Sequence, residues 1–143
     1  MSAEDPFDLA RFVEAQQRDY ARALEELRAG AKRSHWIWYV LPQLRELGRS
    51  ELARRYGIVG LDEARAYLAH PLLGPRLKEC ARALLRHPQL SARQIMDSPD
   101  DLKLRSCMTL FQAADPGEPL FGEVLQAFYE GQPDPATLEL LKR

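Results

Sequence analysis

The segment from Lys32 to Tyr39 holds the densest group of side chains that could do chemistry. It combines cations and a hydroxyl with aromatic rings, namely Lys32, Arg33, Ser34, His35, Trp36, Trp38 and Tyr39. Because the segment lies between two predicted helices, its cations and free N–H groups suit a phosphate or carboxylate. The rings could stack on a base or a nicotinamide. The alternative is structural, since basic residues also favour a helix C-terminus and aromatic residues anchor cores.

The segment from Asp100 to Thr109 is the second candidate. Asp100 and Asp101 fall in the first turn of a predicted helix, where carboxylates suit the helix dipole. Asp101 is also spaced to pair with Arg105. Ser106 and Thr109 lie one turn apart on the border of the apolar stripe. These two hydroxyls either cap a neighbouring loop or line a polar cleft, and the sequence leaves both alternatives open.

The histidines suggest acid–base chemistry at one position, His35, and their spacing argues against a metal site. His35 is the one histidine among other candidate ligands, where it could act as a general acid or base near neutral pH. His70 and His87 each precede a proline near a helix end, where a structural role suffices. No histidine pair has helical ligand spacing, and the common nucleotide, hydrolase and redox signatures are absent. We therefore expect neither a metal nor a cofactor.

The leading hypothesis is a polar pocket, formed by both segments, that binds a nucleotide or ADP-ribose-type anionic ligand. The first segment would supply one wall of the pocket, with Lys32, Arg33, Ser34, His35, Trp36 and Trp38. The second segment would supply the facing wall, with Lys103, Arg105, Ser106 and Thr109. If the pocket hydrolyses its ligand at a glycosidic carbon, the catalytic candidates are His35, Asp100 and Asp101. The alternative is a non-catalytic structural or protein-interaction module whose motif residues are internal salt bridges and core aromatics. RNA binding through the basic loop is a third alternative.

Length and composition fit one globular domain over residues 1–143. The chain is 45% hydrophobic with a net charge of -1, which provides a core and argues against a nucleic-acid coat. No secretory signal is visible, and the longest apolar run, Trp36 to Leu41, is far shorter than a membrane span. Cys80 and Cys107 are isolated. A cytoplasmic protein without a membrane partner is the simplest expectation, and the oligomeric state stays open.

Prolines and capping residues mark the helices that position these segments. Asp5-Pro6, Ser98-Pro99 and Asp134-Pro135 predict three helix N-termini. The apolar period predicts helices at 6–29, 36–41, 49–56, 62–69, 75–86, 99–114, 119–130 and 135–141. Ser91 with Gln94 resembles a capping box for a short turn through Met96. Ser34 is expected to cap the helix at 36–41, although its aromatic and β-branched residues also favour a strand. The pattern predicts an all-α fold of about seven short-to-medium helices, which is not a simple four-helix bundle.

Four stretches carry a family resemblance: DPFDL with the following RFV, KRSHWIWYVLPQ, DEARAYLAHPLLGPRL and SPDDLKLRSCMTLF. From Asp5 to about Leu141 the chain resembles the bacterial family filed as domain of unknown function 1810, sometimes labelled calpastatin-like. The resemblance implies an all-α single domain and no settled activity. Calpastatin-type inhibitors are disordered, whereas this sequence has a core. Gly60 departs from the family pattern, which often has a serine cap there, and the helix layout has a more distant likeness to a helical family linked to ADP-ribose.

Overall fold

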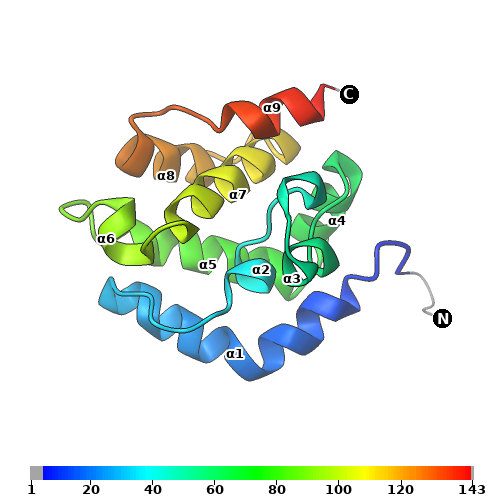
Figure 1. Cartoon of the computed structure of the whole chain (residues 1–143), viewed down its shortest axis with the longest axis horizontal. Helices are drawn as coiled ribbons and strands as arrows, with labels where there is room; N and C mark the ends of the chain where they lie inside the picture. The colour runs from blue at the N-terminus through cyan, green and yellow to red at the C-terminus, as the bar shows by residue number, and fades with distance from the viewer. Residues whose placement is uncertain (1–4, 143) are drawn as a thin grey trace.

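The computed structural model describes residues 5–142 and has an all-α fold (Figure 1). Its helices are α1 (Ala10–Ala29), α2 (Ile37–Val40), the 3-10 helix η1 (Arg45–Leu47), α3 (Glu51–Arg55), α4 (Leu61–Ala69), α5 (Leu73–Leu85), α6 (Ala92–Met96), α7 (Asp100–Ala114), α8 (Leu120–Tyr129) and α9 (Pro135–Leu141). The described residues form nine α-helices, in the regions where the sequence predicts them. Three of these, α2, α3 and α6, are single turns of four or five residues.

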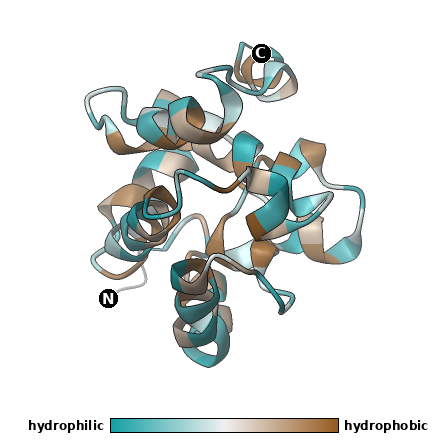
Figure 2. Ribbon diagram, turned by 90° about the vertical axis from the view of Figure 1, so that its left-hand side faces the viewer, coloured by the Kyte–Doolittle hydropathy of each residue, from teal (hydrophilic) through white to brown (hydrophobic). Residues whose placement is uncertain are grey.

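Helices α5 and α7 form the middle of the molecule, with α1 on one side and α8 and α9 on the other (Figure 1). Helix α7 packs against α4, α6, α8 and α9, and α5 packs against α1, α4 and α8. The long helices carry both hydrophilic and hydrophobic residues along their length (Figure 2), and their apolar stripes meet in one core. Within the described residues, no helix is both long and apolar enough to cross a membrane.

The stripe predicted for the first helix is confirmed, but its predicted start is wrong. Phe12, Tyr20 and Leu27 are buried along one face, and Gly30 ends the helix with a φ of 74°. The helix begins at Ala10 rather than Pro6 because Asp8 takes a φ of 53°, which interrupts the helical path. The Asp5 carboxylate still caps the helix, since it accepts hydrogen bonds from two N–H groups further along the chain, at residues 9 and 10.

The other predicted caps have mixed outcomes. Asp134 caps α9 by accepting the N–H of Thr137 at 3.1 Å, as predicted. Ser98 does not cap α7, because the N–H of Asp101 bonds to the backbone carbonyl of Asp97 instead. Ser34 does not cap α2 either, since its hydroxyl donates to a carboxylate of α1.

The connection between η1 and α4 is held by a close approach of two backbone segments. A parallel bridge joins Leu44 to Ile58, and the Arg45 N–H donates to the Ile58 carbonyl at 2.8 Å. Gly57 lies so close to this segment that a Cβ there would come within 2.3 Å of the Arg45 Cα. Only glycine fits such a contact, so the backbone at Arg45 is held close to that at Gly57 and Ile58.

Candidate functional site

The two sequence segments meet at a buried ion pair. Lys32 Nζ lies 2.7 Å from Asp100 Oδ2, and Lys103 Nζ lies 3.9 Å from Asp100 Oδ1. The Lys32 ammonium lies over the Trp36 ring at 4.9 Å from its centroid, and the Lys103 ammonium lies over the Trp38 ring at 5.6 Å. The structure therefore brings five of the predicted residues together, in contacts with one another.

Lys32 and Trp36 are both used within the fold. The Lys32 side chain is 6% exposed and also donates to the Ser34 carbonyl at 2.6 Å. Trp36 is fully buried, so its ring has no free face for stacking on a base. A ligand at this position would have to displace Asp100 from Lys32, which leaves a buried charge without its partner.

Glu26, on α1, holds the Lys32–Trp36 loop in place. Its carboxylate accepts hydrogen bonds from the backbone N–H groups of Arg33 and Ser34, the Ser34 hydroxyl and the Trp36 indole, at 2.6–3.0 Å. Burial by itself would raise the pKa of Glu26, but these hydrogen bonds lower it from 4.5 to about 2. The Glu26 carboxylate therefore stays ionised. It accepts the N–H groups that sequence analysis assigned to an anionic ligand.

Ser106 and Thr109 connect α7 to the start of α9. The Ser106 hydroxyl donates to Asp134 Oδ2 at 3.0 Å, and the Thr109 hydroxyl accepts the Asp134 N–H at 2.8 Å. The Thr137 hydroxyl donates to the same carboxylate at 2.5 Å. Of the two roles left open by the sequence, these contacts correspond to the capping of a neighbouring segment.

Asp101 and Arg105 lie on α7 without pairing to each other in the described part of the chain. Arg105 Nε donates to the Gln132 carbonyl at 2.9 Å, and its guanidinium lies 5.9 Å from the centroid of the Tyr129 ring. The Tyr129 hydroxyl donates to the Asp101 carbonyl. The Asp101 Oδ1 atom is buried without a hydrogen-bond partner among the described residues.

The histidines differ in their contacts. His87 Nε2 lies 2.8 Å from the Arg28 carbonyl, where it caps the C-terminus of α1. His70 Nδ1 accepts the N–H of Leu72 at 3.1 Å, at the start of α5. His35 is exposed, as is Arg33, and neither side chain forms a hydrogen bond or ion pair within residues 5–142. The described His, Cys, Asp and Glu residues form no group that could hold a metal ion.

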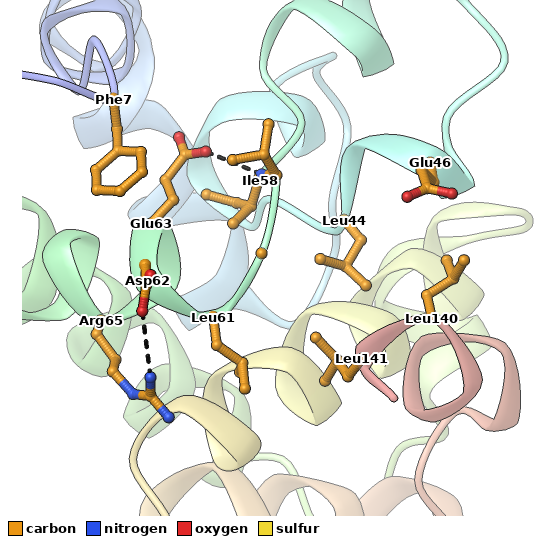
Figure 3. Close-up of a pocket in the computed structure, with 12 residues that line it drawn as sticks. Phe7, Leu44, Glu46, Ile58, Leu61, Asp62, Glu63, Arg65, Leu140 and Leu141 are labelled. Atoms are coloured by element: carbon orange, nitrogen blue, oxygen red, sulfur yellow. Dashed lines mark hydrogen bonds and ion pairs between the residues drawn. The ribbon is translucent and has the colours of Figure 1, made fainter. Parts of the chain in front are cut away.

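A cavity of about 530 Å³ lies at the start of α4, away from both sequence segments (Figure 3). We call it the leucine cavity; its lining residues are Phe7, Leu44, Glu46, Ile58, Val59, Gly60, Leu61, Asp62, Glu63, Arg65, Leu140 and Leu141. Leu44 and Ile58, which are buried, contribute apolar surface to this lining. The charged residues are three carboxylates and one guanidinium, so the lining has a net charge of -2.

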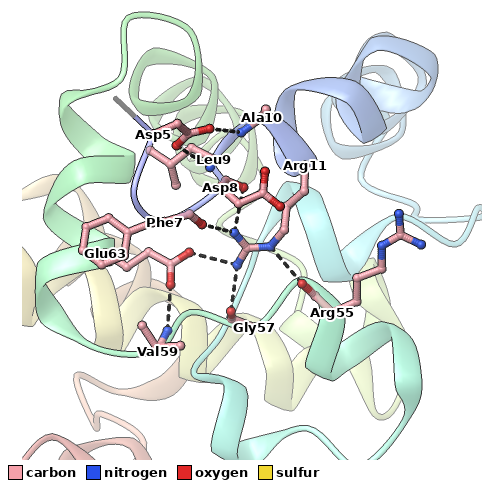
Figure 4. A network of polar contacts seen from close by, with 10 residues as sticks. All are labelled: Asp5, Phe7, Asp8, Leu9, Ala10, Arg11, Arg55, Gly57, Val59 and Glu63. Atoms are coloured by element: carbon pink, nitrogen blue, oxygen red, sulfur yellow. Dashed lines mark hydrogen bonds and ion pairs between the residues drawn. The ribbon is translucent and has the colours of Figure 1, made fainter. Parts of the chain in front are cut away.

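The N-terminal turn before α1 closes one side of this cavity and is fixed by Arg11 (Figure 4). Its guanidinium makes five hydrogen bonds, to the carbonyls of Phe7, Asp8, Arg55 and Gly57 and to Glu63 Oε2, at 2.6–2.9 Å. These use all five N–H donors of the side chain. Glu63 is 2% exposed and also accepts the Val59 N–H at 2.9 Å. Arg11 therefore joins α1, α3 and α4 and has no donor left for a ligand.

A second cavity, of about 340 Å³, lies beside the same network. We call it the arginine cavity; its lining residues are Pro6, Phe7, Asp8, Arg11, Arg45, Arg54, Arg55, Gly57, Val59 and Glu63. Four guanidinium groups against two carboxylates give the lining a net charge of +2. Arg45, Arg54 and Arg55 are exposed, and none of the three forms an ion pair with another described residue. Three arginines without an ion pair to a described residue therefore line one cavity.

Sequence reasoning missed several of these residues. It gave no binding role to the arginines between Arg45 and Arg55, and it gave Arg11 and Glu26 no role. A signal existed for Glu26, because an acidic residue in the last turn of a helix opposes the helix dipole and so has another reason to be there. No local signal exists for Arg11, whose partners lie as far as 52 positions away in the chain.

The comparisons with known proteins give the family. The family described as a protein of unknown function (DUF1810) matches residues 6–141. The chain belongs to this family. Among solved structures it is similar to the crystal structure of Rv1873, a conserved hypothetical protein from Mycobacterium tuberculosis, with 52% identity and a TM-score of 0.92. The match covers 97% of this chain and 99% of that one. No curated protein matches the chain.

Proposed function

We propose that the protein binds a small phosphate-bearing ligand of the nucleotide or ADP-ribose type, and that the phosphate lies in the arginine cavity. One observation carries this proposal: Arg45, Arg54 and Arg55 line a single cavity without an ion pair to any described residue. Guanidinium groups bind phosphate through paired N–H donors, which gives geometric selectivity as well as energy.

The surroundings of the three arginines support a binding site. The Arg45 backbone is fixed against Gly57 and Ile58, and the Arg55 carbonyl is held by Arg11. A rigid backbone reduces the ordering cost of binding. The cavity volume of about 340 Å³ falls within the range of about 300–1,000 Å³ found for small-molecule sites.

The same proposal gives the two sequence motifs a supporting role. Lys32, Asp100 and Trp36 contact one another in a buried cluster, and Ser106 and Thr109 bond to Asp134. These contacts favour the structural alternative for the motifs. We therefore propose that the protein binds the ligand and does not hydrolyse it. A cytoplasmic location belongs to the proposal as well, since Cys80 and Cys107 are free and buried and suit a reducing compartment.

Calorimetric titration with inorganic pyrophosphate and with ADP-ribose tests the proposal. We expect binding by the unmodified protein, and we expect Arg45→Ala and Arg54→Ala each to weaken it about tenfold, since a charge-assisted hydrogen bond contributes about 1.5 kcal/mol or more. Arg86→Ala, at an exposed arginine outside the cavity, serves as the matched control and should bind as the unmodified protein does.

Arg33→Ala separates the arginine cavity from the loop that sequence analysis favours. Arg33 is exposed and uses only its backbone N–H within the fold, so its replacement leaves the Glu26 contacts in place. Binding lost in this variant and retained in Arg45→Ala and Arg54→Ala would overturn the proposed site. Absence of both heat and thermal stabilisation at millimolar ligand would overturn the proposed function.

A further inference from the structure

We infer that the Asp8 carboxylate binds two neighbouring hydroxyls of the ligand, so that the arginine cavity takes a sugar phosphate and not a bare phosphate. The inference rests on the proposed function, because it takes the phosphate to lie against Arg45, Arg54 and Arg55. It goes further by naming the chemical class of the group next to the phosphate and the residue that selects it.

Of the two carboxylates that line the arginine cavity, that of Asp8 is free within residues 5–142. Glu63 accepts hydrogen bonds from Arg11 and from the Val59 N–H, so both of its oxygens have partners. Asp8 is exposed, and its side chain forms no hydrogen bond or ion pair with a described residue. A ligand in this cavity therefore meets one carboxylate whose two oxygens can accept hydrogen bonds.

The backbone of Asp8 is fixed while its side chain is left unused. The Asp8 N–H donates to the Asp5 carbonyl at 3.0 Å, and the Asp8 carbonyl accepts Arg11 Nη1 at 2.9 Å (Figure 4). Its φ of 53° is uncommon for a residue other than glycine, and aspartate tolerates it because the short side chain can bond to the local backbone. Asp97, with a φ of 65°, makes such a bond, since its Oδ1 accepts the Ser98 N–H at 2.8 Å. Asp8 has a similar conformation without that bond, so its carboxylate is available to a ligand.

The charges of the cavity favour a neutral hydrogen-bond donor as the partner of Asp8. A carboxylate beside three guanidinium groups lowers the attraction for phosphate, so it works against a site for phosphate alone. An ammonium group would pair with Asp8, but the net charge of +2 repels it. Hydroxyl groups carry no charge and donate to a carboxylate in charge-assisted hydrogen bonds. Two neighbouring hydroxyls of a sugar ring therefore match the two oxygens of Asp8.

The size and the apolar part of the lining suit the same ligand. The volume of about 340 Å³ lies near the lower end of the range of about 300–1,000 Å³ for small-molecule sites, which accommodates a pentose with its phosphate. Phe7 and Val59 also line the cavity, and the carbon face of a sugar ring can pack against such apolar surface. A sugar phosphate thus finds guanidinium groups for its phosphate and a carboxylate for its hydroxyls.

Titration calorimetry with ribose 5-phosphate, 2-deoxyribose 5-phosphate and inorganic pyrophosphate tests the role of Asp8. The two sugar phosphates differ by one hydroxyl, and its loss leaves no neighbouring pair of hydroxyls on the ring. We expect ribose 5-phosphate to bind to the unmodified protein at least about tenfold more tightly than the deoxy analogue, because a hydrogen bond to a charged acceptor changes affinity by about that factor.

Asp8→Gly removes the carboxylate without straining the backbone, because glycine readily adopts a φ of 53°. We expect the two sugar phosphates to bind to this variant with equal affinity. Pyrophosphate should bind about threefold more tightly than it does to the unmodified protein, because a negative charge has left the cavity. A purely structural role of Asp8 would weaken the binding of pyrophosphate and ribose 5-phosphate together, so the opposite changes distinguish recognition from folding.

Asp97→Gly is the matched control. It replaces the other aspartate of positive φ, which does not line the arginine cavity. All three ligands should bind to it as they bind to the unmodified protein.

The outcomes separate this inference from the proposed function. Equal affinity for the two sugar phosphates in the unmodified protein, or a preference that persists in Asp8→Gly, overturns the role of Asp8; pyrophosphate binding that Arg54→Ala weakens would then leave the phosphate site standing. Phosphoethanolamine binding more tightly than ribose 5-phosphate overturns the hydroxyl assignment in favour of an ammonium group. Absence of binding by both pyrophosphate and ribose 5-phosphate overturns the inference together with the proposed function.

Discussion

Replacement of Glu26 by alanine should destabilise the protein by about 3–4 kcal/mol. The carboxylate accepts four hydrogen bonds, and the largest share of the cost comes from the indole N–H of Trp36, which is fully buried and finds no water. An orphaned buried donor costs about 1–3 kcal/mol. The N–H groups of Arg33 and Ser34 are closer to solvent and add a smaller amount each.

Glu26→Gln separates the charge from the hydrogen bonds. The amide oxygen can still accept the three N–H donors, and the Ser34 hydroxyl can rotate to accept from the new amide, so we expect a cost of about 2–3 kcal/mol, most of it from loss of the charge. Urea unfolding at pH 7, followed by circular dichroism and tryptophan fluorescence, measures both variants. Glu25→Gln, at the exposed neighbouring position, is the control and should lie within about 0.5 kcal/mol of the unmodified protein.

The same carboxylate predicts a pH dependence. Its pKa falls from 4.5 to about 2 on folding, which corresponds to about 3 kcal/mol of stability. Because the folded-state pKa is the lower one, this stability is present above pH 4.5 and is lost as the pH falls toward 2. The Glu26→Gln variant should lose less stability over that interval. Equal slopes for both proteins between pH 5 and pH 2.5, or a cost below about 1 kcal/mol for Glu26→Ala, would refute the reasoning.

Two further variants test the contacts around α7. Lys32→Met leaves the Asp100 carboxylate, whose side chain is 18% exposed, with the longer contact to Lys103, so we expect a loss of about 2 kcal/mol in urea unfolding. Addition of Asp100→Asn should recover part of this loss, and purely additive losses would contradict a direct pairing. Asp134→Ala removes the cap of α9 and the acceptor of the Ser106 hydroxyl, which should cost about 2 kcal/mol in thermal unfolding. Asp134→Asn should retain more than half of that stability, and equal losses for both variants would argue against the capping role.

The helices could be predicted from the sequence because their determinants are local. The stripe of Phe12, Tyr20 and Leu27 follows from helical spacing, and the Asp134-Pro135 pair places the start of α9 within a single dipeptide. The start of α1 was predicted four residues too early because the capping signal of Asp5 reaches Leu9 across a turn in which Asp8 has a positive φ. The residue types in this stretch do not predict that turn.

The candidate site was less predictable because residues far apart in the chain create it. Sequence analysis placed Lys32 and Asp100 in the two candidate segments, and the fold brings their side chains together. It could not tell a salt bridge from a ligand site, since both use the same residue types. Whether a cation is paired depends on contacts such as that of Arg11 with Glu63, 52 positions apart. Only the folded chain shows that Arg45 and Arg54 have no ion pair among residues 5–142.

The position of the two chain ends has a practical consequence for any binding assay. Phe7 and Leu141 stand on the wall of one cavity, so an affinity tag or a fluorophore attached at either terminus begins within a few residues of that wall. Gly117 offers a better place for a label, because it lies in an exposed loop where an added Cβ meets only Asp115 Oδ1, at 3.7 Å. A label in that loop stays clear of both cavities, whereas a terminal tag begins close to the wall of one of them.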